Sequence, residues 1–274
     1  MQNLSEPDFN DEVSNDIEKA AERLREFWEL GEDPIPNIVR LLEKKGFIIA
    51  SSPTNSLGID AFSQKQEIDG RDYYFIILGE DKGSAVRRQF DAAHELGHII
   101  LHDPFLDLND MDKEQFKEIE REANDFAAAF LLPKEAFAKD ISVAPVDFDN
   151  YKHLKRKWKV SISAMTVRAY KIGVISYNQY HYLQRQISQN NWRRQEPLDE
   201  LLKPGVPIAM RKAIELLIEN EIMTGSELLT KLSRDHNLSL PKEEVETLLN
   251  LPPGYLKTKE SKGSSIVSIR NFKK

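Results

Sequence analysis

The feature that most constrains this chain is the pattern H-E-x-x-H at residues 94–98. Apolar residues recur around it at helical spacing, and Ser84 is placed to cap the predicted helix. On a helix His94 and His98 are one turn apart and project from the same face. Two imidazoles at this spacing can bind one tetrahedral zinc ion. Glu95 would then point slightly away from the ion, where it can take a proton from water as a general base.

A third zinc ligand is expected on a second long helix, predicted over residues 113–132 and ended by Pro133. An apolar stripe runs along this helix through Phe116, Ile119, Ala123, Phe126, Ala127 and Phe130. Glu122 stands three residues after Ile119, so the phase predicts that it points inward with the stripe. An inward carboxylate is costly unless a cation compensates its charge, and an ion held by two histidines would do so.

The other glutamates of this helix are less favoured as ligands. Glu118 lies one turn before Glu122 and is the alternative third ligand. The other alternative is that Glu122 is an ordinary charge on a polar helix. Glu114 and Glu120 fall off the apolar stripe and are predicted to face solvent.

Two further residues are expected near the ion without binding it. His102 lies roughly 80° around the helix from His94, and a three-histidine pattern would need glycine in place of Leu101 and histidine in place of Pro104. His102 is therefore predicted to support the site from outside or to be structural. Asp91 lies one turn before His94 and is a candidate to orient an imidazole, with an ordinary surface position as the alternative.

The chain before the motif predicts a small sheet preceded by helices. Residues 1–12 are predicted to be a disordered lead-in, and helices are expected up to Gly31 and up to Gly46. Three strand-like runs then follow, at residues 47–51, 57–63 and 73–78, with a D-G turn signal between the last two. We expect a short, mostly antiparallel sheet.

The chain after the second helix predicts two further helical regions. A linker over residues 141–150 is followed by residues 151–194, which carry ten Lys or Arg and no Asp or Glu, whereas residues 1–33 carry eleven acidic and three basic side chains. Residues 151–195 are predicted to form a basic subdomain like a helix-turn-helix, which indicates either an anionic partner such as nucleic acid or an acidic neighbouring surface. A helical extension with a basic tail is expected over residues 196–274.

Composition narrows the chemistry and the compartment. The 274 residues carry a net charge of −7 and include no cysteine, so disulfides and thiolate metal sites are excluded. No apolar run approaches the roughly 18 residues of a membrane span, and the polar start predicts no signal peptide. We expect a cytoplasmic protein without a membrane-bound part; the sequence does not define its oligomeric state.

Two runs resemble the ImmA/IrrE family of zinc metallopeptidases: R-R-Q-F-D-A-A-H-E-L-G-H-I-I-L-H at residues 87–102 and E-R-E-A-N-D-F-A-A-A-F-L-L-P at residues 120–133. The resemblance extends over residues 15–195. It implies an α+β fold with a small gluzincin-like peptidase domain, here residues 13–140, followed by helical regions. By matching motifs it implies zinc ligands at His94, His98 and Glu122 and a general base at Glu95.

The resemblance also implies a function. Family members typically cleave a partner transcriptional repressor that has a helix-turn-helix domain, which relieves repression of a mobile element or a stress response. The leading interpretation is therefore a zinc endopeptidase with a repressor as substrate. The alternative is a non-catalytic regulator that binds a repressor or DNA through residues 151–194.

Overall fold

A computed structural model describes residues 16–52, 61–79, 84–102 and 111–256. The chain divides into two compact units, Met1–Ala209 and Met210–Lys274, and each is described by itself. The predicted lead-in, the residues after His102 up to 110 and the basic tail lie outside the described residues. The domain boundaries inferred from the sequence stay predictions.

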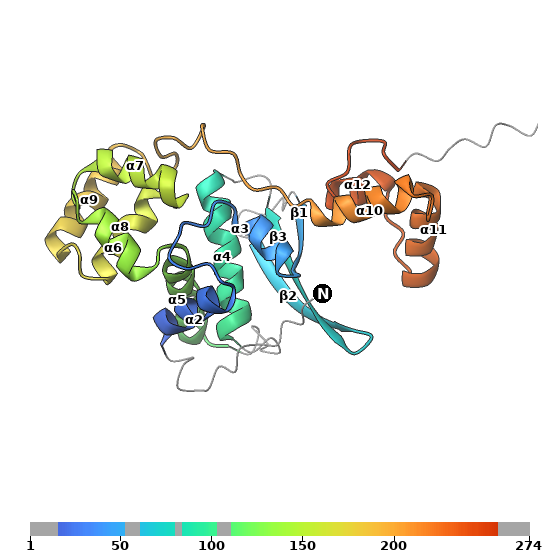
Figure 1. Ribbon diagram of the computed structural model, residues 1–274, viewed down its shortest axis with the longest axis horizontal. Coiled ribbons are helices and arrows are strands. Elements are labelled where there is room, and N and C mark those ends of the chain that lie inside the picture. The colour runs from blue at the N-terminus through green and yellow to red at the C-terminus, as the bar shows by residue number, and fades with distance from the viewer. Residues whose placement is uncertain (1–15, 53–60, 80–83, 103–110, 257–274) are drawn as a thin grey trace, which may run out of the picture. The chain divides into compact units, whose positions relative to one another are not determined.

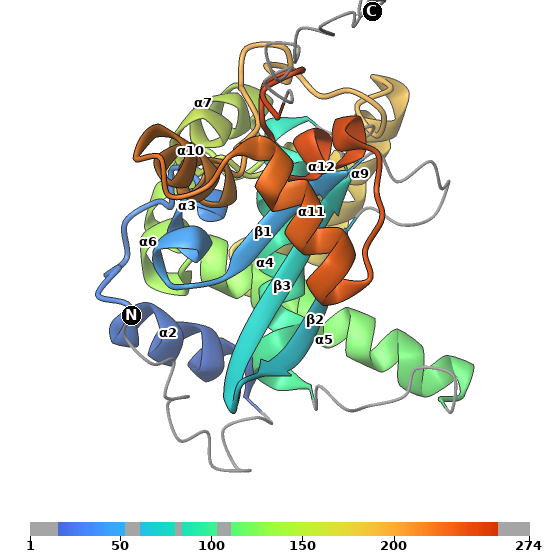
Figure 2. The same ribbon diagram turned by 90° about the vertical axis from the view of Figure 1, so that its right-hand side faces the viewer.

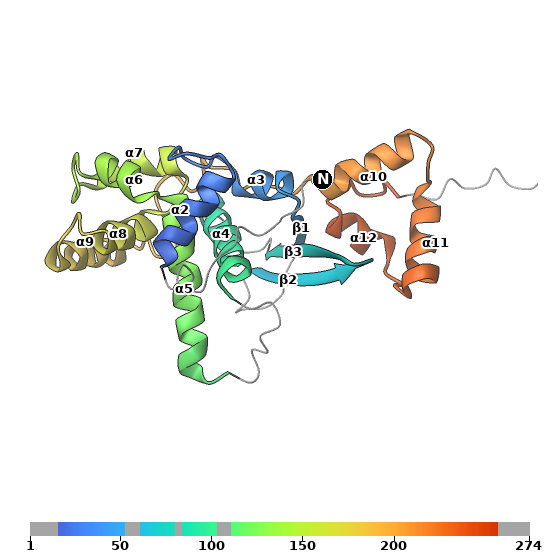
Figure 3. The ribbon, with the colours of Figure 1, turned by 60° about the horizontal axis from the view of Figure 1, so that its bottom comes forward.

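A three-stranded sheet forms one layer of the first unit. Its strands are β1 (Ile48–Ser52), β2 (Ala61–Ile68) and β3 (Arg71–Gly79), in the order β1-β3-β2. The D-G turn is confirmed: Asp69 and Gly70 both have positive φ, as a tight hairpin turn requires, and β2 and β3 are antiparallel (Figure 3).

The sheet is mostly antiparallel, as expected, because the antiparallel pairing of β2 with β3 is the longer one, and a parallel pairing of β1 that was not predicted completes it. β1 pairs with the other edge of β3 and runs parallel to it. A parallel neighbour cannot be joined by a tight turn, so the sequence signal of the hairpin carried no information on β1. β1 and β2 are therefore the two edge strands of the sheet, and β3 lies between them.

The two long helices predicted from the sequence are present. They are α4 (Ala85–Leu101) and α5 (Lys113–Leu131), and they pack against each other. Ser84 caps α4 as expected, accepting a hydrogen bond from the backbone N–H of Arg87. α4 also contacts β2 and β3, so it lies on one face of the sheet (Figure 2).

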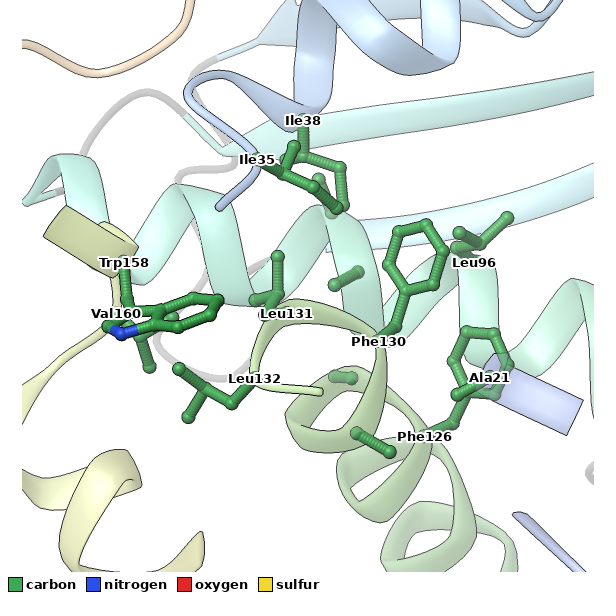
Figure 4. Close-up of a cluster of buried hydrophobic side chains, with 14 of the residues drawn as sticks. Ala21, Ile35, Ile38, Leu96, Phe126, Phe130, Leu131, Leu132, Trp158 and Val160 are labelled. Atoms are coloured by element: carbon green, nitrogen blue, oxygen red, sulfur yellow. The ribbon is translucent and has the colours of Figure 1, made fainter. Parts of the chain in front are cut away.

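Two shorter helices close the core around α4 and α5. α2 (Ile17–Phe27) packs against α5, and α3 (Ile38–Lys44) contacts α4 and β1. Asp16 and Asn37 cap them through their side chains. The buried residues are continuous from α2 through α5 to Trp158 and Val160, so the basic segment shares one core with the motif helices (Figure 4).

Four helices continue the first unit: α6 (Lys134–Ile141), α7 (Phe148–Trp158), α8 (Ile162–Lys171) and α9 (Tyr177–Gln189), which gather on one side (Figure 1). The last three lie almost entirely within residues 151–195, the segment predicted to be like a helix-turn-helix. α6 was not predicted as a helix. Only two of its residues, Phe137 and Ile141, are buried, which is too few for a clear helical pattern, and no side chain caps its start. The connection between α6 and α7 retains most of the predicted linker.

The second unit consists of α10 (Ala209–Glu219), α11 (Gly225–His236) and α12 (Lys242–Leu248). Its small core contains Val245, Leu251 and Leu256. Glu246 is buried and accepts the backbone N–H groups of Gly254 and Leu256, which fixes the turn after α12. Among the described residues of the whole chain, every helix is too short or too polar to cross a bilayer.

Candidate metal centre

The two motif histidines lie on α4 with their rings facing one point. Nε2 of His94 and Nε2 of His98 are 3.0 Å apart, and both side chains are half-buried. The helical spacing predicted this geometry.

The carboxylate beside these rings belongs to Glu120 of α5. One oxygen of Glu120 lies 3.3 Å from Nε2 of His94, and the other lies 3.3 Å from Nε2 of His98. His94, His98 and Glu120 form a group of side chains that can hold a metal ion. Glu120, which the sequence analysis placed in solvent, therefore faces the histidine pair with 38% of its side chain exposed.

Glu122, favoured as the third ligand from the sequence, lies elsewhere. Its carboxylate contacts Nε2 of His102 at 3.1 Å. Glu118, the alternative, is exposed and pairs with Arg121 of its own helix. The geometry thus brings His94 and His98 together with Glu120, whereas Glu122 lies beside His102; the predicted ligand role of Glu122 stays a prediction.

The packing of α4 on α5 explains why Glu120 is the carboxylate at the pair. Gly97 lies so close to α5 that a Cβ there would be 3.1 Å from the Cα atom of Ala123. His94 is three residues before Gly97, and Glu120 is three residues before Ala123. Each of the two side chains therefore lies about one helical turn from the contact between Gly97 and Ala123. The apolar stripe misled because its first residue, Phe116, is 43% exposed and belongs to a part of α5 that is not buried.

The three ligand atoms fit a tetrahedral zinc ion. Zinc–nitrogen and zinc–oxygen bonds of 2.0–2.2 Å at the tetrahedral angle place neighbouring ligand atoms about 3.3 Å apart. The separations here are 3.0, 3.3 and 3.3 Å. With three protein ligands, a tetrahedral ion would keep one position for water or substrate.

Charges at the site are strongly coupled. Hydrogen bonds to His94 and His98 hold the pKa of Glu120 well below its usual range. Burial lowers the pKa of His94, but its hydrogen bond to Glu120 outweighs burial and leaves that pKa raised. The carboxylate therefore compensates positive charge at the two imidazoles, as it would compensate a cation.

Glu95 lies next to this group and is almost fully buried, with 6% exposed. Burial raises its pKa, and a hydrogen bond with Ser63 of β2 opposes that shift. A buried carboxylate with a raised pKa beside a candidate metal site suits a general base near neutral pH. Ser63 was not identified from the sequence, since the contact depends on how β2 packs on α4.

His102, predicted to lie outside the ligand set, contacts both a ligand and a carboxylate. Its Nδ1 is 3.0 Å from Nδ1 of His98, and its Nε2 contacts Glu122 as described above. Asn124 also forms a hydrogen bond with His94; it lies one turn after Glu120, which is the signal that could have identified it. The predicted role of Asp91 in orienting an imidazole stays a prediction.

A cavity of about 500 Å³ adjoins Glu120. Its walls come from three helices and are mainly apolar, and they include Phe90, Phe116, Ala128, Ala164 and Val167. The cavity is large enough to take an apolar side chain next to the candidate metal centre.

Half of the Lys and Arg side chains of the basic segment form ion pairs within the protein. Five of the ten pair with carboxylates: Lys152 with Asp149, Lys155 with Glu196 and Asp199, Lys157 with Asp140, Arg168 with Glu18, and Lys171 with Asp125. Of the two explanations that the charge asymmetry left open, internal compensation accounts for these five. A nucleic-acid partner for the remaining cations stays a prediction.

Comparison with known proteins agrees with this site. Residues 43–170 match the model of a peptidase family described as the IrrE N-terminal-like domain. Among matching structures is a Mycobacterium tuberculosis transcriptional regulator, 18% identical with a TM-score of 0.38; the match covers 57% of this chain and 48%, about half, of that chain. No curated protein matches the sequence. The match covers α4, α5 and the sheet, and it supports the resemblance of these residues to the ImmA/IrrE family.

Proposed function

We propose that this protein is a zinc-dependent endopeptidase, with His94, His98 and Glu120 as metal ligands. The observation that carries the proposal is the set of three ligand atoms at tetrahedral separations beside a buried glutamate. The peptidase family match over residues 43–170 supports it.

The residues of the site have separate roles in peptide hydrolysis. A zinc ion held there would polarise the scissile carbonyl and acidify a water molecule. Glu95 accepts the proton of the attacking water and delivers it to the leaving amine nitrogen. Ser63 holds the Glu95 carboxylate in place from β2. Because Glu95 is buried, its carboxylate is weakly solvated and its basicity is increased.

We propose a helix-turn-helix transcriptional repressor as the substrate, on the basis of the family. The edge strand β2 supports a protein substrate, because an extended segment could pair with it beside α4. The cavity next to Glu120 would receive one apolar side chain of that segment. The reaction would take place in the cytoplasm, where such repressors act.

Zinc binding tests the ligand set. We expect Glu120→Gln to lower zinc affinity strongly, whereas Glu118→Gln, an exposed control on the same helix, leaves it unchanged. Competition with a chromophoric chelator measures both affinities. If Glu118→Gln and Glu120→Gln bind zinc equally well, the proposed ligand set is wrong.

Cleavage tests the activity. The purified protein is incubated with the repressor encoded beside it, and the products are identified by mass spectrometry. Loss of a general base typically costs about 10²- to 10⁴-fold in rate, so Glu95→Gln should bind zinc but leave the repressor intact over the same period. If Glu95→Gln relieves repression in cells as well as the wild type, the non-catalytic regulator replaces the peptidase.

A further inference from the structure

A chain of polar contacts leads away from the candidate metal centre, from His98 to His102 and from His102 to Glu122. His98 has its Nε2 towards His94 and Glu120 and its Nδ1 towards His102, at 3.0 Å. Nε2 of His102 lies 3.1 Å from the Glu122 carboxylate. The His102 side chain is 11% exposed, so it is shielded from water that could replace these contacts.

The proton positions in this line follow from the donors available. An ionised carboxylate only accepts, so Nε2 of His102 must carry the proton that it donates to Glu122. A neutral His102 then has a lone pair on Nδ1 and accepts a hydrogen bond from Nδ1–H of His98. With its proton on Nδ1, His98 would offer the lone pair of Nε2 to a cation bound beside Glu120, in place of the hydrogen bond that this nitrogen makes with Glu120 in the metal-free protein.

We propose that Glu122 and His102 are positioning residues that fix the metal-binding tautomer and the ring orientation of His98. The inference rests on the proposed function, because it assumes an ion at Nε2 of His98. It also explains why neither residue is a ligand: both nitrogens of His102 are engaged, and Glu122 is turned towards His102. Outer partners of this kind typically change metal affinity about 10- to 100-fold.

Substitutions at position 102 separate positioning from packing. In His102→Asn the amide oxygen can take the place of Nδ1 and accept from His98, whereas His102→Leu fills similar space without an acceptor. We expect His102→Leu to lower zinc affinity about 10- to 100-fold and His102→Asn to restore most of it. His153→Leu, at an exposed histidine of α7, is the control and should bind like the wild type.

Zinc affinity is measured by chelator competition, and the visible spectrum of the cobalt-substituted protein reports the ligand geometry. Circular dichroism of the metal-free variants confirms folding. If His102→Leu does not fold, Glu122→Leu replaces it, and the same loss of affinity is expected. Equal affinities in wild type and His102→Leu, or an equal loss in Asn and Leu variants, would overturn the inference alone. A wild-type protein that binds no zinc would overturn the proposed function together with it.

Discussion

The close contact between α4 and α5 at Gly97 makes Gly97→Ala an informative perturbation. The added Cβ would lie 3.1 Å from both the Cα atom and the carbonyl oxygen of Ala123, and 3.2 Å from a ring carbon of Phe126. Ordinary contacts of this kind begin at 3.4 Å. Because two of the three atoms are backbone, relief requires α5 to move away by about 0.3 Å, the difference between 3.4 and 3.1 Å.

Two opposing effects decide the stability of this variant. Alanine in place of glycine inside a helix is worth about 1 kcal/mol of stability. Overpacking a tight contact costs about 1–3 kcal/mol. We therefore expect a net loss of about 0–2 kcal/mol, although helix propensity alone predicts a gain.

The effect on zinc should be larger than the effect on stability. His94 belongs to α4 and Glu120 to α5, so the distance between them depends on how closely the two helices pack at Gly97. Metal sites tolerate deviations of only about 0.2 Å in ligand distances. A shift of α5 by the amount needed here would exceed that tolerance, so we expect Gly97→Ala to bind zinc at least about tenfold more weakly.

Thermal unfolding of the metal-free protein and chelator competition measure the two effects separately. Arg87→Ala, at an exposed position of the same helix, provides a control that also introduces alanine but adds no contact. A Gly97→Ala variant that melts above the wild type and binds zinc with unchanged affinity would refute the argument that this contact sets the position of Glu120.

Three further predictions test other features of the site and its support. Lys155 is fully buried between Glu196 and Asp199, so Lys155→Met should lower the free energy of unfolding by about 3–5 kcal/mol by leaving buried carboxylates unpaired. Denaturant unfolding measures this loss, and Arg156→Met, at an exposed neighbour, should change the stability little. Equal stabilities of the two variants would contradict the pairing argument. Because burial raises the pKa of Glu95, ionised Glu95 destabilises the metal-free fold, and Glu95→Gln should melt higher than the wild type at pH 7. This difference in melting temperature should disappear below the usual glutamate pKa, where Glu95 is protonated in both the folded and the unfolded state. A difference that persists at low pH would rule out this cause. Ala164→Phe would fill the cavity beside Glu120 and should lower kcat/KM for the repressor without lowering zinc affinity; unchanged kcat/KM would show that substrate does not use the cavity.

Local signals in the sequence were sufficient for much of the fold. The N-cap at Ser84, the Asp69-Gly70 turn and the helical phase around His94 each act within a few residues, and the structure confirms all three. The pairing of β1 with β3 joins residues far apart in the chain and leaves no local pattern. For the same reason the sequence predicted the hairpin of β2 and β3 but not the parallel pairing of β1.

The compensation of the basic segment also depends on contacts across the fold. Arg168 pairs with Glu18, which is 150 residues away in the chain, and also donates to the carbonyl oxygen of Leu132 at the end of α5. Lys155 is held by carboxylates that follow α9. The sequence showed that these charges needed partners, but only the packing of α7 and α8 within the fold decides which partners they have.

The third ligand shows how far helical phase can be extended. Hydrophobic phase is an average over a helix, and it assumes that the same face is buried along the whole length. α5 violates this assumption: all of its buried residues lie at Ala123 or beyond, while Phe116 is 43% exposed. Glu120 and Glu122 lie just before the buried part, where the facing direction is set by the contact of Ala123 with Gly97 and not by the stripe. Both glutamates face histidines of α4: Glu120 lies at His94 and His98, and Glu122 lies at His102. The residue that we propose as the third ligand therefore lies two positions before the one that helical phase favoured.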